Sequence, residues 1–395
     1  MNIVFITNEY VSEDKFDGGL ASYLSRVAHS LVEIRHNVII LVASHKNEHF
    51  YQDKIHIFRV KCYSHKINRI LKLLHLGRGG FIRWIIQSYL LNKKLKFIIQ
   101  KEKIDIVQYS NYEATALFVP KNVNYVIRIS SYQKLWDKEQ GKRYSLNSII
   151  CQYLDLKVLK KCNYIYSPSY LLANILSKKL NKTVYVLEPP FPRASIQLND
   201  NVYNEYLYNK KYLLYYGRLS LYKGVTNIAE ILHVLLSKYN DLYFAFIGTA
   251  MMFNKKSIVD YIYHKANNYK DRVLCMEKLR YENLLPIIKR AYAVVLPSRI
   301  DNLPNTCIEA MANNKIVIGT HGASFEQIIE DNVNGFLCKI NSNESLLNSI
   351  DRVLSLDQNK KKEIELNAGK IIDRLSPKQT TKNLLEFYQK IIEKK

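Results

Sequence analysis

Two basic residues in a short segment framed by glycines have the types and spacing that bind a diphosphate. Residues 216–224 read Tyr-Gly-Arg-Leu-Ser-Leu-Tyr-Lys-Gly, so Arg218 and Lys223 lie between Gly217 and Gly224. A guanidinium can grip phosphate oxygens with two parallel hydrogen bonds, and an ammonium adds a compact positive charge. The two cations on one loop repel each other unless an anion lies between them. The segment therefore predicts a diphosphate site, with two solvated surface charges as the alternative.

Two carboxylates follow in the segment 296–312, which reads Leu-Pro-Ser-Arg-Ile-Asp-Asn-Leu-Pro-Asn-Thr-Cys-Ile-Glu-Ala-Met-Ala. The pattern predicts a strand that ends at Leu296, a loop that carries Asp301, and a helix that begins near Asn305–Thr306. Free N–H groups at that helix start would face the same crevice as Asp301. A carboxylate there can accept hydrogen bonds from two sugar hydroxyls. The alternative for Glu309 is stabilisation of the helix dipole.

A pair of glycines, Gly18 and Gly19, follows the first expected strand and opens a helix. Glycine lets the backbone approach a ligand closely, and the bare N–H groups of a helix start bind anions. The pair predicts either a ligand-binding loop or a tight turn with no ligand.

Short apolar runs alternate with segments of helical period along the whole chain. Runs that are apolar on both faces, with helices such as Gly19–Ile34 and Thr226–Lys238 between them, indicate parallel sheets. Two consecutive series of this kind predict two α/β domains. The expected strands are Asn2–Thr7, Asn37–Ala43, Lys54–Val60, Ile104–Tyr109, Tyr125–Ile129, Tyr164–Ser167, Tyr212–Tyr216, Leu242–Ile247, Val273–Met276, Ala293–Leu296 and Ile316–Gly319.

The boundary between the two domains is expected near Leu187–Asn201, where residues 188–193 read Glu-Pro-Pro-Phe-Pro-Arg. Three prolines in four positions cannot continue a helix or a central strand. We therefore expect an N-terminal domain over 1–190, a C-terminal domain over 200–378 and a terminal amphipathic helix over 380–395.

The spacing of Asp301 and Glu309, with seven residues between them, resembles a known signature. It is followed by Ala-Met-Ala and by the segment 322–335, Gly-Ala-Ser-Phe-Glu-Gln-Ile-Ile-Glu-Asp-Asn-Val-Asn-Gly. The region is similar to the E-x7-E region of family 4 retaining glycosyltransferases (glycosyl transferases group 1), with Asp in place of the more common first Glu. The resemblance implies the α/β GT-B fold: two Rossmann-like parallel-sheet domains face each other across a cleft, and the C-terminal helix returns to the first.

The resemblance also assigns roles to the residues. The N-terminal domain would bind the acceptor, and the C-terminal domain would bind a nucleotide-sugar. The implied catalytic residues are Arg218, Lys223, Asp301 and Glu309. The implied donor-binding residues are Gly18, Gly19, Gly217, Lys278, Leu279, Asn302, Leu303, Asn305 and Thr306. Many members have a histidine after the strand at 125–129, whereas this chain has acceptor-side candidates of another kind there, namely Arg128, Ser130 and Tyr132.

The sequence contains no Asp-x-Asp pair, so we expect no metal and no other cofactor, and the basic loop would hold the diphosphate. We expect a retaining hexosyl transfer from a UDP-sugar rather than a GDP-sugar, in which the leaving diphosphate helps to deprotonate the acceptor. The expected acceptor is a saccharide, such as a polyprenyl-diphosphate-linked one, in cell-surface polysaccharide biosynthesis (O-antigen or capsule).

The charge of the chain favours an anionic partner. Its 395 residues include 58 Lys+Arg and 35 Asp+Glu, a formal net charge of +23. Residues 65–103 carry ten Lys/Arg and one acid, Glu102, and they form an amphipathic stretch that includes Trp84. This composition fits docking on an anionic membrane, with an ordinary pair of solvated helices as the alternative. We expect a cytoplasmic protein that is peripheral on the inner face of the cytoplasmic membrane.

Two other functions remain open at this point. A basic nucleic-acid-binding protein would also carry +23, but no DNA- or RNA-binding motif is evident and we expect no nucleic acid as partner. Another GT-B enzyme, such as a sugar-nucleotide epimerase, is disfavoured by the pairing of residues 301 and 309. The six scattered cysteines include no C-x-x-C pair, which indicates a reducing compartment.

Overall fold

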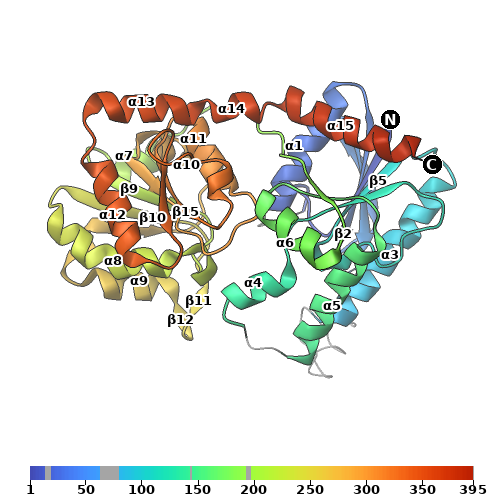
Figure 1. Ribbon diagram of the computed structural model, residues 1–395, viewed down its shortest axis with the longest axis horizontal. Helices are drawn as coiled ribbons and strands as arrows, with labels where there is room; N and C mark the ends of the chain where they lie inside the picture. The colour runs from blue at the N-terminus through green and yellow to red at the C-terminus, as the bar shows by residue number, and fades with distance from the viewer. Residues whose placement is uncertain (14–18, 63–79, 143–144, 193–196, 395) are drawn as a thin grey trace. The chain divides into compact units, whose positions relative to one another are not determined.

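The computed structural model describes residues 1–13, 19–62, 80–142, 145–192 and 197–394. The chain forms two compact units (Figure 1). Unit 1 consists of Met1–Pro192 with Leu375–Lys395, and unit 2 consists of Arg193–Arg374. Unit 2 thus ends at Arg374, a few residues before residue 378, where we expected the C-terminal domain to end. None of the described helices is long and apolar enough to cross a membrane.

Unit 1 is built on an eight-stranded sheet with the order β3-β4-β2-β1-β5-β6-β7-β8. Its neighbouring strands run parallel, except that β3 pairs antiparallel with β4. The chain adds β2 and β4 on one side of β1 and then returns to the other side with β5, so the strand order reverses between β1 and β5. The strands are β1 (Asn2–Thr7), β2 (Asn37–Ser44), β3 (Glu48–Gln52), β4 (Ile55–Lys61), β5 (Ile106–Ser110), β6 (Tyr125–Arg128), β7 (Ile165–Ser167) and β8 (Val184–Val186).

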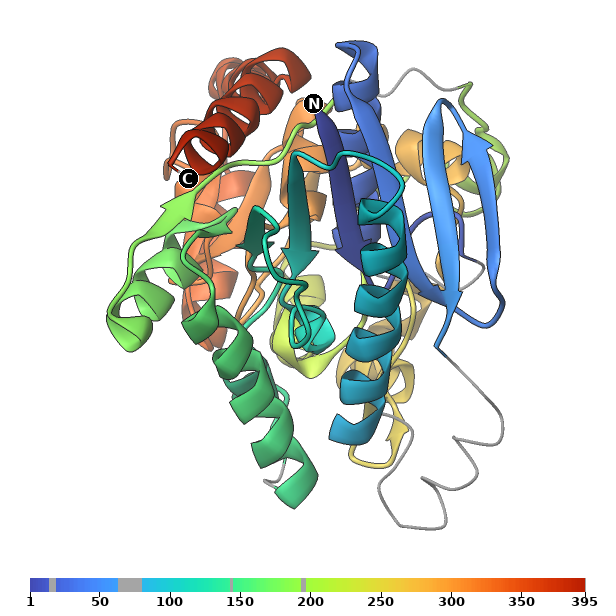
Figure 2. The same cartoon turned by 90° about the vertical axis from the view of Figure 1, so that its right-hand side faces the viewer.

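Helices cover both faces of this sheet, and β1 shows how the sequence divides between them. Its alternate residues Ile3 and Phe5 pack with α1 and α15, whereas Val4 and Ile6 pack with α3, α5 and α6. Figure 1 shows α15 near α1, and Figure 2 shows the opposite face with α3 and α5. The helices are α1 (Gly19–Glu33), α3 (Phe81–Ile99), η1 (Tyr112–Ala114), α4 (Gln133–Glu139), α5 (Leu146–Lys161), α6 (Tyr170–Leu180) and α15 (Pro377–Glu393).

The C-terminal helix α15 is an integral part of unit 1. Its residues Leu384, Phe387, Tyr388 and Ile391 are buried in the same hydrophobic core as α1. The Tyr388 hydroxyl also donates a hydrogen bond of 2.6 Å to Gln108 Oε1 on β5. Apolar burial at helical spacing therefore attaches the end of the chain to the first sheet.

Unit 2 contains a six-stranded parallel sheet with the order β13-β10-β9-β14-β15-β16. The chain runs outward from β9 through β10 to β13 and then returns to the other side of β9, so the order reverses between β9 and β14. The strands are β9 (Lys211–Tyr216), β10 (Leu242–Ile247), β13 (Val273–Met276), β14 (Ala293–Val295), β15 (Val317–His321) and β16 (Phe336–Lys339), with a small hairpin of β11 (Met252–Phe253) and β12 (Lys256–Ser257).

The helices of unit 2 connect these strands, as a doubly wound α/β fold requires. They are α7 (Asn201–Tyr206), η2 (Leu221–Lys223), α8 (Val225–Lys238), α9 (Ile258–Ala266), η3 (Asn267–Arg272), α10 (Tyr281–Arg290), α11 (Asn305–Ala312), η4 (Phe325–Gln327), α12 (Asn343–Leu354), α13 (Gln358–Gly369) and α14 (Ile371–Arg374).

Candidate functional site

The loops after β9 and β14 meet at the point where the strand order of unit 2 reverses. Open parallel sheets bind ligands at the carboxyl ends of strands at such a point. Lys223, from the first loop, forms an ion pair with Asp301 Oδ2 from the second, although 78 residues separate them. The Lys223 side chain is 26% exposed and that of Asp301 is 13% exposed. The structure therefore brings two of the predicted residues together in a partly desolvated place.

The main chain of the loop that carries Lys223 packs closely against the loop that carries Asp301, and Gly224 lies at the point of contact. Its φ is +73°, and a Cβ at this position would lie 1.8 Å from the carbonyl oxygen of Pro297. Next to this contact, Arg299 N–H donates a 2.9 Å hydrogen bond to the carbonyl oxygen of Tyr222. Only a residue without a side chain allows this approach. The positions of Lys223 and Asp301 relative to each other thus depend on main-chain packing.

Arg218 lies at the start of the same loop, directly after Gly217. The Tyr215 hydroxyl donates a 2.7 Å hydrogen bond to the main-chain oxygen of Arg218. The guanidinium is half-buried, and its Nη1 lies 3.4 Å from the Tyr222 hydroxyl. Gly217 has a φ of +126°, which favours glycine at this turn. The loop therefore carries two cations on a backbone that neighbouring tyrosines hold in place.

The Asp301 carboxylate is oriented by its own loop. Its Oδ1 accepts a 3.0 Å hydrogen bond from Asn302 N–H, and its main-chain oxygen accepts one of 3.0 Å from Ser324 Oγ. Asp301, Asn302 and Leu303 are all buried. The contact from Ser324 was not predicted from the sequence.

Helix α11 begins beside this loop and has no side-chain cap. Pro304 occupies the N-cap position, and no side-chain hydrogen bond caps the helix. The first N–H groups of a helix have no acceptor within the helix, so they attract anions. Thr306, in the first turn, lies near Gly217, since a Cβ on that glycine would be 3.6 Å from Thr306 Cγ2. The predicted residues Asn305 and Thr306 are both half-buried at this helix start.

Tyr216, the last residue of β9, links this strand to α11 and lies near Glu309. Its hydroxyl donates a 2.6 Å hydrogen bond to the main-chain oxygen of Thr306. Burial, together with the negative charge of Glu309, raises the pKa of Tyr216 well above its usual value of 10. The phenol therefore stays protonated and keeps its hydrogen bond. Glu309 itself is half-buried in the second turn of α11.

The predicted residues Lys278 and Leu279 lie after β13, at the same edge of the sheet but two strands away from β9. Lys278 is exposed and Leu279 is half-buried. The structure thus places these two residues at the same edge of the sheet as the ion pair of Lys223 and Asp301, but not within it.

Comparison with known proteins supports a specific activity. Residues 204–370 match the family model of glycosyl transferases group 1. The chain is 23% identical over 376 residues to an uncharacterized glycosyltransferase of Methanocaldococcus jannaschii, which covers 90% of this chain and 89% of that relative. The chain is a glycosyltransferase.

Solved structures show that this glycosyltransferase has the GT-B fold. Sucrose-phosphate synthase from Thermosynechococcus elongatus matches with a TM-score of 0.80 at 13% identity, covering 100% of both chains. WaaG, a glycosyltransferase involved in lipopolysaccharide biosynthesis, matches with a TM-score of 0.71 at 15% identity, covering 96% of this chain and 98% of WaaG. The predicted fold is thereby confirmed.

The glycine pair of the glycosyltransferase lies at the edge of the described structure. Gly19 is the exposed first residue of α1, and Gly18 lies outside the described residues. Of the residues predicted to bind the acceptor, Arg128 ends β6 and Ser130 follows it, and Arg128 Nη1 donates a 3.1 Å hydrogen bond to Ser130 Oγ. Tyr132 is 5% exposed and packs in the hydrophobic core.

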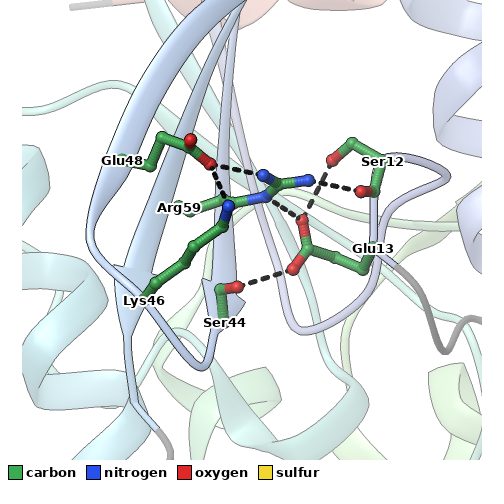
Figure 3. A network of polar contacts seen from close by, with 6 residues as sticks. All are labelled: Ser12, Glu13, Ser44, Lys46, Glu48 and Arg59. Atoms are coloured by element: carbon green, nitrogen blue, oxygen red, sulfur yellow. Dashed lines mark hydrogen bonds and ion pairs between the residues drawn. The ribbon is translucent and has the colours of Figure 1, made fainter.

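A charged network that the sequence did not reveal holds Ser12 and Glu13, which follow β1 (Figure 3). Arg59 Nε donates a 2.7 Å hydrogen bond to Glu13 Oε1, and its Nη2 donates one of 2.5 Å to the main-chain oxygen of Ser12. Glu13 Oε2 accepts a further hydrogen bond of 2.6 Å from Ser44 Oγ. On the other side, Lys46 and Arg59 hold the pKa of Glu48 below its usual value. The network anchors residues 12–13 to β2 and β4.

The basic stretch 65–103 is described only in part, because residues 65–79 lie outside the described residues. The remainder forms α3, which buries Trp84 at 6% exposure. Trp84, which belongs to the predicted amphipathic stretch, is buried in the hydrophobic core of unit 1. The exposed aromatic residues of α3 are instead Tyr89 and Phe97. A cavity of about 530 Å³ beside α3 is lined by Asn47, Glu48, His49, Phe58, Arg59, Val60, Lys61, Leu90, Lys93, Lys94 and Phe97.

Proposed function

We propose that this glycosyltransferase is a metal-independent retaining hexosyltransferase whose donor is a nucleotide-diphosphate sugar, UDP-linked rather than GDP-linked. The observation that carries the proposal is the meeting of Lys223 and Asp301 where the strand order of unit 2 reverses. A cation and a carboxylate at one ligand-binding edge suit a ligand with an anionic part and a hydroxylated part.

The roles follow from the chemistry of each group. Lys223 and Arg218 bind the diphosphate, and the uncapped N–H groups of α11 extend the positive potential. Asp301, oriented by Asn302 N–H, accepts hydrogen bonds from hydroxyls of the transferred sugar. Glu309 accepts hydrogen bonds from the ribose hydroxyls of the nucleotide. Fixed charges and dipoles of this kind stabilise a leaving diphosphate without a metal.

The transfer breaks the bond between the anomeric carbon and the diphosphate oxygen and forms a bond from that carbon to the acceptor oxygen. The acceptor hydroxyl gives its proton to the departing diphosphate, which lies on the same face of the sugar. Lys223 and Arg218 stabilise the negative charge that develops on the leaving group. The sugar keeps its anomeric configuration, and no protein nucleophile takes part.

A donor screen tests this proposal. Thermal unfolding is measured with UDP-, GDP- and ADP-sugars, and sugar release from the ligand that stabilises best is then followed with and without EDTA. We expect a UDP-sugar to raise the melting temperature most, by about 2–4 °C at saturating concentration, and release to be unchanged by EDTA. Loss of release with EDTA would refute the metal-independent mechanism. Stabilisation by short DNA or RNA alone, checked by a gel shift, would favour the nucleic-acid alternative.

The acceptor in this proposal is a saccharide carried on a membrane lipid, such as a polyprenyl diphosphate, in the assembly of a cell-surface polysaccharide (O-antigen or capsule). The involvement of WaaG in lipopolysaccharide biosynthesis supports it. The surface of α3 supports it as well, because Lys93 and Lys96 are exposed beside Tyr89 and Phe97. Exposed cations and aromatic rings together bind anionic lipid surfaces. The enzyme would then act on the inner face of the cytoplasmic membrane.

Charge reversal on α3 tests membrane docking. We expect the wild-type protein to float with anionic phosphatidylglycerol vesicles at low salt and to be released at high salt. The double variant Lys93→Glu/Lys96→Glu should bind these vesicles at least about tenfold more weakly, since each lysine contributes about 1 kcal/mol near an anionic surface. Lys178→Glu/Lys179→Glu on α6 is the matched control, because it makes the same change of charge at two exposed lysines. Equal loss of binding in both variants would contradict docking through α3.

A further inference from the structure

Unit 1 contains a buried arginine whose hydrogen-bonding capacity is mostly unused. Arg128, the last residue of β6, is 7% exposed. Its Nη1 donates a hydrogen bond to Ser130 Oγ, whereas its buried Nε has no hydrogen-bond partner. The structure gives Arg128 no ion pair with any carboxylate among the described residues. An arginine offers five N–H donors, and burying a cation without a counter-charge costs free energy.

The aromatic neighbours of Arg128 pack against its guanidinium but do not accept hydrogen bonds from its N–H groups. The guanidinium lies over the Tyr23 ring, 3.8 Å from the centroid. The Tyr23 hydroxyl lies 2.8 Å from that of Tyr166, and Tyr166 and Tyr388 both donate 2.6 Å hydrogen bonds to Gln108 Oε1. Burial raises the pKa of Tyr166 and of Tyr388 well above 10, so both phenols stay neutral. The cluster holds the ring under Arg128 but supplies no anion.

A second buried arginine shows what a structural role looks like in this chain. Arg272 in unit 2 is 9% exposed, and it also lies over a tyrosine ring, 4.6 Å from the centroid of Tyr269. Both terminal nitrogens of its guanidinium, unlike those of Arg128, donate hydrogen bonds to main-chain oxygens in the last turn of α8 and in the residues that follow it. These oxygens belong to Leu236 (2.6 Å), Tyr239 (2.8 Å), Asn240 (3.1 Å) and Leu242 (3.4 Å). Arg128 has no equivalent set of acceptors.

Arg128 also lies at the edge of the sheet where the parallel strands end. It ends β6, and the parallel neighbour β5 ends beside it at Ser110. Ser110 Oγ lies 3.1 Å from Ser130 Oγ, and Asn111 Oδ1 accepts a 2.7 Å hydrogen bond from Ser130 N–H. The Ser130 hydroxyl that contacts the guanidinium is thus itself held by Ser110 and Asn111 at the carboxyl ends of the strands. Parallel sheets place their ligands at this edge.

We propose that Arg128 binds an oxyanion, a phosphate or carboxylate group, of the acceptor substrate. The guanidinium fork matches either group with two parallel hydrogen bonds, and the hydroxyls of Ser130 and Ser110 add further polar contacts. The inference rests on the proposed function, because it names a group on the acceptor of that reaction. It makes Arg128 a specificity residue, since an acceptor without the anion leaves the buried cation unpaired.

Anion binding at unit 1 tests the proposal without any transfer reaction. Arg128→Gln and Arg128→Lys are each made in a Lys223→Ala background, so that phosphate on the basic loop of unit 2 contributes little. Thermal unfolding and calorimetric titration are measured with inorganic phosphate and with glucuronate, against chloride at equal ionic strength. We expect one of the two anions to bind the parent and to bind Arg128→Gln at least tenfold more weakly. Arg128→Lys should fall between them, since it keeps the charge but loses the fork.

The stability of the variants separates binding from a structural role. Arg128→Gln should melt within about 2 °C of its parent or above it, because it removes a buried charge that lacks a counter-ion. Arg272→Gln should melt at least about 5 °C below its parent, because four main-chain oxygens lose their donor. An equal loss of stability in the two variants, or anion binding unaffected by Arg128→Gln, would overturn the proposal.

Stabilisation by UDP, measured with Lys223 intact, tests the donor site separately. Anion binding at Arg128 without UDP binding would refute the proposed donor and leave the Arg128 site standing. UDP binding without any anion effect at Arg128 would refute the anionic acceptor alone.

Discussion

Replacing Lys223 with alanine is expected to lower kcat/KM for sugar transfer at least tenfold, a change of about 1.4 kcal/mol in the barrier. Lys223 is the cation that the fold places against Asp301, and its ammonium is the group best placed to stabilise the leaving diphosphate. The measurement is steady-state transfer, or donor hydrolysis, with the donor identified by thermal shift. Lys238→Ala is the matched control, because Lys238 also forms an ion pair, with Asp351 at 2.8 Å, but at the end of α8. It should keep wild-type turnover.

The ion pair offers a sharper version of the same test. Lys223→Ala leaves the Asp301 carboxylate buried without its cation, so activity could fall through a disturbed loop rather than through the diphosphate. The double variant Lys223→Ala/Asp301→Asn removes that uncompensated charge. If Lys223 binds the diphosphate, the double variant is at least as impaired as Lys223→Ala, and Lys223→Arg alone retains part of the activity. Recovery of transfer in the double variant would show that Lys223 only balances Asp301.

The strands that could be predicted best from the sequence are central strands that are buried on both faces. The observed bounds of β1 and β10 are the expected ones. In contrast, β3 was missed because its five residues, Glu-His-Phe-Tyr-Gln, are almost all exposed on an edge strand. Such a strand carries little apolar pattern, and its pairing with β4 is decided by the neighbouring chain. Whether a strand could be predicted therefore depended on the burial of its residues and not on their strand propensity.

Some features of the candidate site could also be predicted from the sequence, and others could not. Lys223 and Asp301 could be found from motifs, because their chemistry is tied to local spacing around a strand end. The hydrogen bond from Tyr216 to Thr306 could not, since it joins residues 90 positions apart. The burial of Trp84 could not be predicted either, because the buried face of α3 also contains the polar residues Gln87, Ser88 and Asn92 and so shows no clear apolar stripe. Contacts that depend on the packing of two elements need the structure.

Replacing Gly224 with alanine is expected to impair both transfer and folding, because the added methyl group has no room. The added Cβ would lie 1.8 Å from the Pro297 carbonyl oxygen and 2.6 Å from its carbonyl carbon, and the φ of +73° disfavours any side chain. The two loops must therefore separate, which moves Lys223 away from Asp301. A displacement of about 1 Å at a reacting group can cost 100-fold in rate. We expect transfer to fall about 100-fold and the free energy of unfolding to fall by about 3 kcal/mol.

Gly322→Ala separates backbone strain from the steric clash. Gly322 also has a positive φ, +87°, but a Cβ there would meet no atom within 4 Å. Alanine at position 322 should therefore cost only the left-handed strain, about 1–2 kcal/mol, and transfer should stay within about threefold of wild type. Unfolding is followed by urea titration, and transfer is measured at a temperature where both variants are folded. Both substitutions introduce backbone strain, but only Gly224→Ala introduces a steric clash. If the two variants lost activity equally, the close packing of Gly224 against Pro297 would not be what positions Lys223.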